Sequence, residues 1–435
     1  MNEQIIITGM GIVSALGNNV EENLCALQEN RTGIGPLRYL RTSHKEFPVG
    51  EVKMTDEEMV NLLKIPSDKL TTRTSLMGML AVREALKNAD IQYATSDNSI
   101  CDVRPSEIGN QRIALINGTT VGGMDKSERF YIDFFENDTK TGYILTHDCG
   151  SCTEMIADYF GIFSQVDTIS TACSSAANAI LLGAELLKSG RADIVVAGGA
   201  ECITKFHLNG FNTLMILDKE QCRPFDATRA GLNLGEGAAY VVMERESDMR
   251  LSGMRYATSE VGNRKSEIGK SQIELKGYAN TCDAFHQTAS SPDGEGAYLA
   301  MKKALEDAQL TPGQIDYINA HGTGTENNDV SEGTAIVRLF GEKIPPVSST
   351  KSFTGHTTSA PGGVESVISI LALQHNFIPA NLNFSEKIPE LSFVPYCDIR
   401  YPISEKQQSQ IELKHILCNS FGFGGNDTSL IFSKI

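Results

Sequence analysis

The chain has 435 residues, of which 41% are hydrophobic and 39 are glycine, a composition typical of a folded, turn-rich enzyme. Its net charge of −16 argues against general binding to nucleic acid, because such binding requires a basic surface. The first residues do not resemble a signal peptide, and no apolar run approaches the roughly 18 residues of a membrane span, so we expect a cytoplasmic protein without a membrane partner. The ten cysteines show no disulfide framework. Cys149 and Cys152 are interpreted as reduced structural thiols, with redox activity as the alternative.

The first half of the chain is predicted to alternate strands and helices. Its opening strand, residues 5–8, runs into Gly9 and Gly11, but no third glycine follows at the spacing of a dinucleotide-binding loop. Helices are predicted over residues 19–30, 56–64 and 75–90, the last strongly amphipathic. Short β-branched or apolar runs predict strands over residues 112–120, 168–171, 193–201 and 238–244.

An internal repeat relates this half to the rest of the chain. Residues 80–90 align with residues 299–309, and each predicted helix is followed by a polar loop and a strand, at 112–120 and at 315–325. Two copies are too few for a solenoid, so the repeat indicates two similar α/β halves packed together. The second half also contains a predicted helix at 364–375 and predicted strands at 347–350, 416–420 and 429–432. Residues 125–152 have no counterpart there.

Cys173 lies where a predicted strand turns into a helix that ends near Lys188 and Gly190. The positive end of the helix dipole is expected to make this thiol easier to ionise than an ordinary cysteine. Most free cysteines are inert and buried, so this position alone does not establish a nucleophile.

Three polar stretches follow strands of the second half. They contain His321, Lys351 and His356, and the glycine-rich turn at residues 419–427. Open α/β sheets bind ligands at the carboxyl ends of their strands. Either histidine alone is commonly structural, but a cysteine at an elbow together with two histidines and a lysine at strand ends indicates nucleophilic catalysis.

These stretches resemble the signatures of the β-ketoacyl-acyl-carrier-protein synthases, in the family's order and over essentially the whole chain. The similarity is to the elongating Cys-His-His type, which includes β-ketoacyl synthase II and polyketide ketosynthases. The segments that carry it are Thr171-Ala-Cys-Ser-Ser175, Asn319-Ala-His-Gly-Thr-Gly-Thr325, Lys351-Ser-Phe-Thr-Gly-His356 and Asn419-Ser-Phe-Gly-Phe-Gly-Gly425. The resemblance implies a thiolase fold with two halves, residues 1–250 and 251–435, in five α-β-α-β-α layers, usually as a homodimer.

The resemblance also implies a reaction and its residues. Cys173 would accept an acyl group, and the backbone N–H groups of Cys173 and Phe423 would form an oxyanion hole. Malonyl thioester would then lose CO2, with His321 and His356 stabilising the enolate that attacks the acyl group. Lys351 would support the histidines, with Glu365 as its ion-pair partner.

Further positions match residues that bind substrate in the family. Thr323 and Thr325 match contacts to the pantetheine arm, Phe423 a gate on the acyl pocket, and Val121 a residue that limits chain length. No metal and no cofactor are expected, because the substrates are carried on the phosphopantetheine of an acyl carrier protein. The candidates for docking that protein are Lys69, Arg73 and Arg223.

The chain departs from the family pattern away from these residues. Asn426-Asp427 replaces a usual Thr-Asn, His147 and Asp148 stand among positions that are usually apolar, and Met215 replaces a basic docking residue. We therefore expect a specialised polyketide-like or polyene pathway rather than bulk fatty-acid elongation. The alternatives are a non-catalytic chain-length-factor subunit of a heterodimer, which usually lacks the cysteine, and a thiolase, for which Cys418 lies in the wrong motif.

Overall fold

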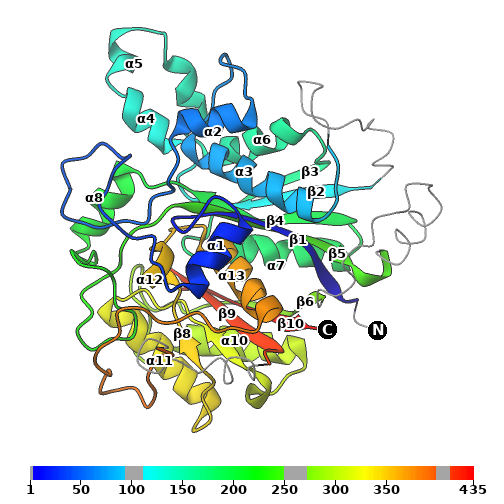
Figure 1. Ribbon diagram of the computed structural model, residues 1–435, viewed down its shortest axis with the longest axis vertical. Helices are drawn as coiled ribbons and strands as arrows, with labels where there is room; N and C mark the ends of the chain where they lie inside the picture. Colours follow the sequence, from blue (N-terminus) through cyan, green and yellow to red (C-terminus); the bar gives the residue numbers. More distant parts are fainter. Residues whose placement is uncertain (1–2, 94–110, 249–271, 398–411) are drawn as a thin grey trace.

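The computed structural model describes residues 3–93, 111–248, 272–397 and 412–435 (Figure 1). The described part of the first half contains five strands: β1 (Ile5–Val13), β2 (Ile113–Gly118), β3 (Gln165–Ile169), β4 (Ile194–Glu201) and β5 (Gly237–Arg245). Its helices are α1 (Val20–Gln28), α2 (Asp56–Leu63), α3 (Arg73–Asn88), α4 (Met124–Phe130), α5 (Asp133–Glu136), the 3-10 helix η2 (Thr141–Thr146), α6 (Cys149–Phe160), α7 (Ser175–Lys188) and α8 (Lys205–Thr213).

The described part of the second half also contains five strands. Its strands are β6 (Ile273–Cys282), β7 (Tyr317–Asn319), β8 (Val347–Ser348), β9 (His415–Gly422) and β10 (Asn426–Lys434). Its helices are α10 (Glu295–Ala308), the 3-10 helix η3 (Pro312–Gln314), α11 (Glu326–Phe340), α12 (Lys351–Thr354) and α13 (Pro361–His375).

The strand order shows that the two halves have the same topology. Outward from the junction of β1 and β6, one half runs β1-β5-β4-β2-β3 and the other β6-β10-β9-β7-β8. Each strand of the first half therefore has an equivalent five strands later. The junction itself is short, because β1 and β6 pair only through Ile6–Ile7 and Ile273–Glu274.

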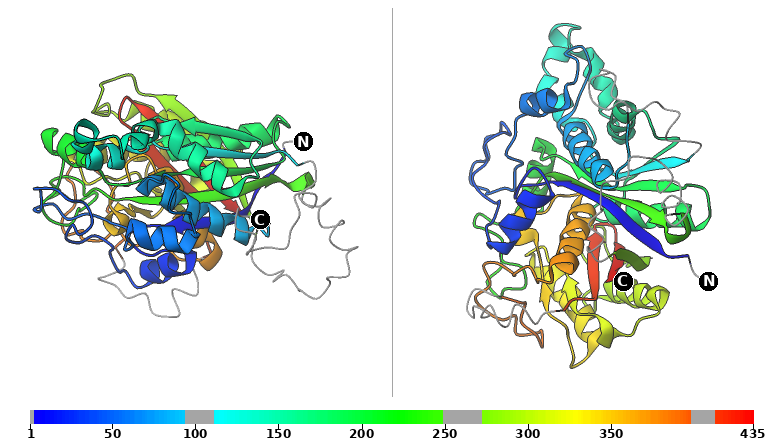
Figure 2. Two further views of the ribbon diagram at one scale, coloured as in Figure 1. Left: turned by 90° about the horizontal axis from the view of Figure 1, so that it is seen from above. Right: turned by 45° about the vertical axis from the view of Figure 1, so that its right-hand side comes forward.

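Helices cover both faces of each half-sheet and so produce five layers (Figures 1 and 2). Helices α3 and α6 lie outside the first half-sheet, and α10 and α11 lie outside the second. Between the half-sheets, α7 packs against α13. Every residue of α13 from Pro361 to Leu373 is buried, as expected of a helix with no face toward solvent. The expected five-layer α/β arrangement is confirmed.

The sequence repeat has a direct counterpart in the packing of strand on helix. A Cβ on Gly9 of β1 would lie 2.3 Å from the Ala85 carbonyl oxygen of α3, and a Cβ on Gly277 of β6 would lie 2.6 Å from that of Ala304 in α10. Ala85 and Ala304 occupy the same position in the aligned segments. Gly9 and Gly11 are therefore not part of a loop; they lie inside β1, where a missing side chain lets the helix approach.

Several elements differ from the expectation. Strand β6 and helices α6, α8, α11 and α12 were not predicted. The segment 125–152, which contains most of α4, α5, η2 and the start of α6, has no equivalent between β7 and β8, where α11 lies. The expected boundary between residues 250 and 251 falls outside the described residues. Within the described ranges, none of the helices has the length and apolar character needed to cross a membrane.

Of the glycine-rich segment at 419–427, residues 419–422 end β9 and residues 426–427 begin β10, where the unusual Asp427 is only 5% exposed. Burial raises the pKa of its carboxyl group to about 8, and the nearby charges of Asp283 and Glu332 act in the same direction. An unfolded aspartate has a pKa of about 3.9. Between these values the folded chain holds a proton that the unfolded chain releases, so this group makes the fold less stable as the pH rises.

We therefore expect Asp427→Asn to be more stable than the wild type at pH 7 to 8 and equally stable near pH 4. The reason is that the amide imitates the neutral carboxyl group that the fold prefers. The free energy of unfolding, measured in urea across this pH range, tests the expectation. A stability difference that does not change with pH would contradict it.

Candidate active site

Cys173 lies on a strained turn between β3 and α7. Ala172, just before it, has φ = 51°, a left-handed conformation that residues with a Cβ rarely adopt. Two hydrogen bonds hold the turn: Ser174 Oγ donates to the Thr171 carbonyl at 2.8 Å, and the Thr171 N–H donates to Ser175 Oγ at 2.9 Å. The predicted strand-to-helix elbow is thus confirmed.

The protonation state of Cys173 differs from the expectation. The residue is only 6% exposed, and burial raises the pKa of its thiol to about 11. A hydrogen bond from the Phe423 N–H and the charge of Lys351 lower this pKa by smaller amounts. The expected easy ionisation is therefore wrong for the resting chain, because loss of water outweighs the nearby positive charge. The thiol must lose its proton as the sulfur attacks.

His321 is held by the buried ammonium group of Lys351. The Lys351 Nζ lies 3.2 Å from His321 Nδ1, 2.5 Å from the His321 carbonyl oxygen and 2.5 Å from Glu365 Oε1. An ammonium group has three N–H donors and no acceptor, so these contacts use all three. The Nδ1 of His321 must then accept a hydrogen bond, which places the proton of the neutral ring on Nε2.

His356 reaches the same tautomer by a different contact. It follows α12, and the Thr358 backbone N–H donates to its Nδ1 at 3.0 Å. A backbone N–H can only donate, so the proton of the neutral ring is again on Nε2. Burial lowers the pKa of both His321 and His356 well below the usual range, and the Lys351 charge lowers it further. Both rings are therefore neutral at pH 7.

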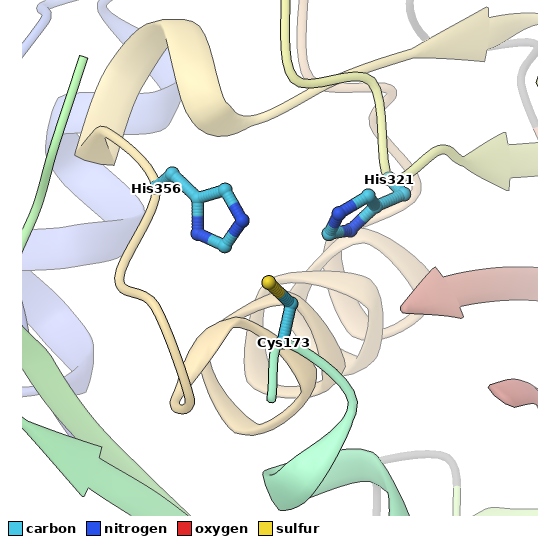
Figure 3. Close-up of side chains that lie close together, drawn as sticks. All are labelled: Cys173, His321 and His356. Carbon is cyan, nitrogen blue, oxygen red and sulfur yellow. The ribbon is translucent and has the colours of Figure 1, made fainter. Parts of the chain in front are cut away.

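The three side chains converge on one point (Figure 3). The Cys173 sulfur and one nitrogen of each imidazole lie within 4.8 Å of one another. The imidazole centroids are 5.3 Å apart and the ring planes are nearly perpendicular, at 89°. This geometry suits two N–H donors that approach a single oxygen beside the sulfur.

In the described part of the chain, these same three residues are the group with the spacing to hold a metal ion. Cysteine and histidine are suitable zinc ligands by type. The Lys351 ammonium group, 3.2 Å from His321, opposes a cation there because like charges repel strongly in a buried site. A metal-free site remains our prediction.

The glycine-rich turn brings Phe423 over the sulfur. Gly424 and Gly425 have φ values of 83° and 76°, which glycine adopts without strain, and the Phe423 N–H points at Cys173. The Phe423 ring stacks on Phe211, with centroids 5.9 Å apart. The two groups expected to form an oxyanion hole are therefore adjacent.

A cavity of about 300 Å³ opens onto this site. Thr323, Thr325 and Phe423 line it together with the three converging residues, as expected of contacts to a substrate arm. Val121 does not line it. That residue is 5% exposed at the end of β2, where its N–H donates to Glu201 at 3.2 Å. The structure of the single chain therefore does not place Val121 in this pocket.

Two of the three candidate docking residues form ion pairs within the chain, Arg73 in the interior and Arg223 near the surface. Arg73 is 7% exposed and its Nε lies 3.0 Å from both carboxylate oxygens of Glu236, so the prediction that it docks a partner is wrong. Arg223 forms ion pairs with Asp218 at 3.1 Å and Glu220 at 2.7 Å. Lys69 is exposed. A basic residue near a helix start cannot be distinguished by sequence alone from one that is buried in an ion pair.

Glu332 was missed by the sequence analysis. It is 1% exposed, accepts hydrogen bonds from the N–H groups of His321 at 2.9 Å and Gly322 at 2.7 Å, and accepts another from Asn419 at 3.0 Å. It thus fixes the backbone that carries His321. The sequence feature that could have identified Glu332 is a carboxylate among the small residues of α11. This feature is weak, because α11 itself was not predicted.

Known proteins with similar sequences belong to a family of condensing enzymes. The chain matches the family profiles "Beta-ketoacyl synthase, N-terminal domain" over residues 2–249 and "Beta-ketoacyl synthase, C-terminal domain" over residues 273–385. It is 30% identical to the 3-oxoacyl-[acyl-carrier-protein] synthase 2 of Synechocystis, over 99% of this chain and 98% of that protein.

Similar solved structures include two ketosynthase complexes. The ishigamide ketosynthase/chain length factor is 26% identical with a TM-score of 0.82 and full coverage of both chains. A ketosynthase in complex with its chain length factor from Xenorhabdus doucetiae is 28% identical with a TM-score of 0.78, over 100% of this chain and 98% of that one. Together with the Cys-His-His geometry, these matches show that the chain belongs to the β-ketoacyl synthase family of condensing acyltransferases.

Proposed function

We propose that Cys173, His321, His356 and Lys351 carry out a decarboxylative condensation of carrier-bound thioesters to a 3-oxoacyl thioester. The observation that carries this proposal is the meeting of one thiol and two neutral imidazole N–H donors at a single point. No further cofactor takes part, since the phosphopantetheine arrives with the acyl carrier protein.

In the first half-reaction, the Cys173 sulfur attacks the acyl thioester. The carbonyl oxygen becomes negative and is held by the N–H groups of Cys173 and Phe423. The carrier thiol leaves and takes up the proton that Cys173 loses. Because the resting thiol has a raised pKa, this proton transfer accompanies the attack rather than preceding it.

In the second half-reaction, a malonyl thioester enters along Thr323 and Thr325. Its carboxylate leaves as CO2, and the electron pair of the broken bond forms an enolate whose oxygen accepts from the Nε2–H groups of His321 and His356. The enolate carbon attacks the acyl carbonyl, the bond to sulfur breaks, and the Cys173 thiolate that leaves takes up a proton from water.

We assign the reaction to a specialised polyketide-like or polyene pathway. The support is the departures at His147, Asp148 and Met215, and the likeness to ketosynthases described with chain length factors. The competing assignment is a non-catalytic chain-length-factor role, which the assembled Cys173 site disfavours. Elongation of plain acyl chains on the housekeeping carrier as fast as by the housekeeping synthase would contradict the specialised pathway.

We also propose a dimer, either of this chain or with a related ketosynthase-like chain. The segment 125–152 exposes five large apolar side chains: Tyr131, Ile132, Phe135, Ile144 and Leu145. Their exposed fractions run from 51% to 78%, and such a concentration on one segment is typical of a protein interface.

For the nucleophile, Cys173→Ala is expected to abolish condensation and leave malonyl-carrier decarboxylation intact. The alanine removes the acyl acceptor but none of the donors to the enolate. Release of CO2 and formation of the 3-oxoacyl product are measured in parallel. Unchanged condensation would refute the assignment of Cys173.

For the enolate donors, His356→Ala is expected to slow decarboxylation by about 10²- to 10³-fold, as for other lost oxyanion donors. His356→Asn should lose less, because its amide still presents an N–H donor. If the two variants were equally impaired, His356 would not act as a hydrogen-bond donor.

For the interface, the double variant Phe135→Glu/Leu145→Glu is expected to convert a dimer of about twice 47.2 kDa into single chains. Two buried carboxylates would oppose contact between the apolar surfaces. Light scattering gives the mass, and Val394→Glu, at a similarly exposed apolar residue of the second half, is the control. A dimer that survives the double variant would place the interface elsewhere.

A further inference from the structure

The cavity over Cys173 opens at the end of helix α8. Met215 and Ile216 line the cavity, and Met215 is also 87% exposed, so it forms part of the rim where the cavity reaches solvent. Leu214 beside it is 43% exposed. A thioester carried on a protein can reach the sulfur only if that protein comes to this rim.

Met215 adopts a backbone conformation that glycine would adopt at lower cost. Helix α8 ends at Thr213, Leu214 caps it, and Met215 follows with φ = 56°. Glycine is preferred at such a left-handed position, and a side chain there costs roughly 1 kcal/mol. Since the Met215 side chain is almost fully exposed, packing within the chain does not compensate for this cost.

The rest of the rim offers almost no charge. Among the described residues that line the cavity there is no lysine or arginine, and Glu326 is the single charged residue. Two arginines lie nearby but are engaged: Arg229 donates to the Thr325 and Glu326 carbonyls, and Arg223 is paired with Asp218 and Glu220. The remaining polar groups of the rim are hydroxyls and amides: Thr288, Ser290, Asn327 and Asn328.

We propose that the acyl carrier protein docks on this rim mainly through an apolar contact with Met215 and Leu214, because exposed cations such as Lys69 and Lys219 are not among the residues that line the cavity. The inference rests on the proposed function, which requires a carrier at the mouth of the cavity. The chemistry of the rim selects a carrier that presents an apolar side chain beside its pantetheine attachment point. A carrier that depends on acidic residues there would find no cation among the lining residues.

The sharpest test is Met215→Gly, because it removes the side chain and relieves the backbone at once. We expect thermal stability equal to or above that of the wild type, and a KM for the malonyl-loaded carrier from the source cell raised about tenfold. Leu214→Ala, at a rim residue that does not line the cavity, should also raise the carrier KM while the rate with malonyl-pantetheine, which brings no protein, stays unchanged. Met215→Leu should restore carrier use, and Leu62→Ala, which shortens an exposed leucine on α2, should have no effect.

Docking by apolar contact also predicts a weak dependence of carrier KM on salt between about 50 and 200 mM. An unchanged carrier KM in Met215→Gly, or a KM that rises steeply with salt and falls in Met215→Arg, would overturn the proposal. Calorimetric binding of the holo-carrier separates this result from failure of the proposed function. If the wild type bound the carrier through Met215 but condensed nothing, the docking surface would stand and the function would fall.

Discussion

The buried ammonium group of Lys351 is the interaction on which the site depends. Its three hydrogen bonds join the end of β7, the start of α12 and the interior of α13. A buried ion pair adds little net stability, but removing one partner costs several kcal/mol. The contribution of the Lys351–Glu365 pair is therefore to the geometry of the site rather than to the stability of the fold. The pair fixes the His321 ring and its tautomer, and the Lys351 charge helps to keep both imidazoles neutral.

The two-fold repeat of the fold brings these groups to one place. Cys173 follows β3 and Lys351 follows β8, the equivalent strands of the two halves. Helices α7 and α13 then carry the two ends together in the middle layer. Gly362 allows this contact, since a Cβ there would lie 2.4 Å from the Ala177 nitrogen. The Ala176 N–H also donates to Ser359, which ties the loop after His356 to the helix behind Cys173.

Much of this arrangement could be predicted from the sequence. The aligned helices at residues 80–90 and 299–309 indicated two similar halves, and the motifs around Cys173, His321, Lys351 and His356 lie together as expected. These features are encoded by hydrophobic periodicity and by local motifs at strand ends, both of which can be recognised in the sequence alone.

The errors concern properties that only packing decides. The pKa of Cys173 rises because the thiol is buried, although its position before α7 favours the opposite shift. Arg73 is sequestered by Glu236, 163 residues away in the chain. The Val121 N–H donates to Glu201 and the residue does not line the cavity of the single chain, so its expected role in limiting chain length stays a prediction. Glu332 was missed since its partners, the backbone N–H groups of His321 and Gly322, leave no trace in sequence.

The central claim is that both imidazoles are neutral and carry their proton on Nε2. Nitrogen-15 NMR of the histidine side chains tests it most directly, with His321→Gln and His356→Gln used to assign the signals. We predict that both rings remain neutral Nε2–H tautomers at pH 6, below the usual histidine pKa of about 6.5. An imidazolium signal or an Nδ1–H tautomer at either position in the resting enzyme would contradict the account.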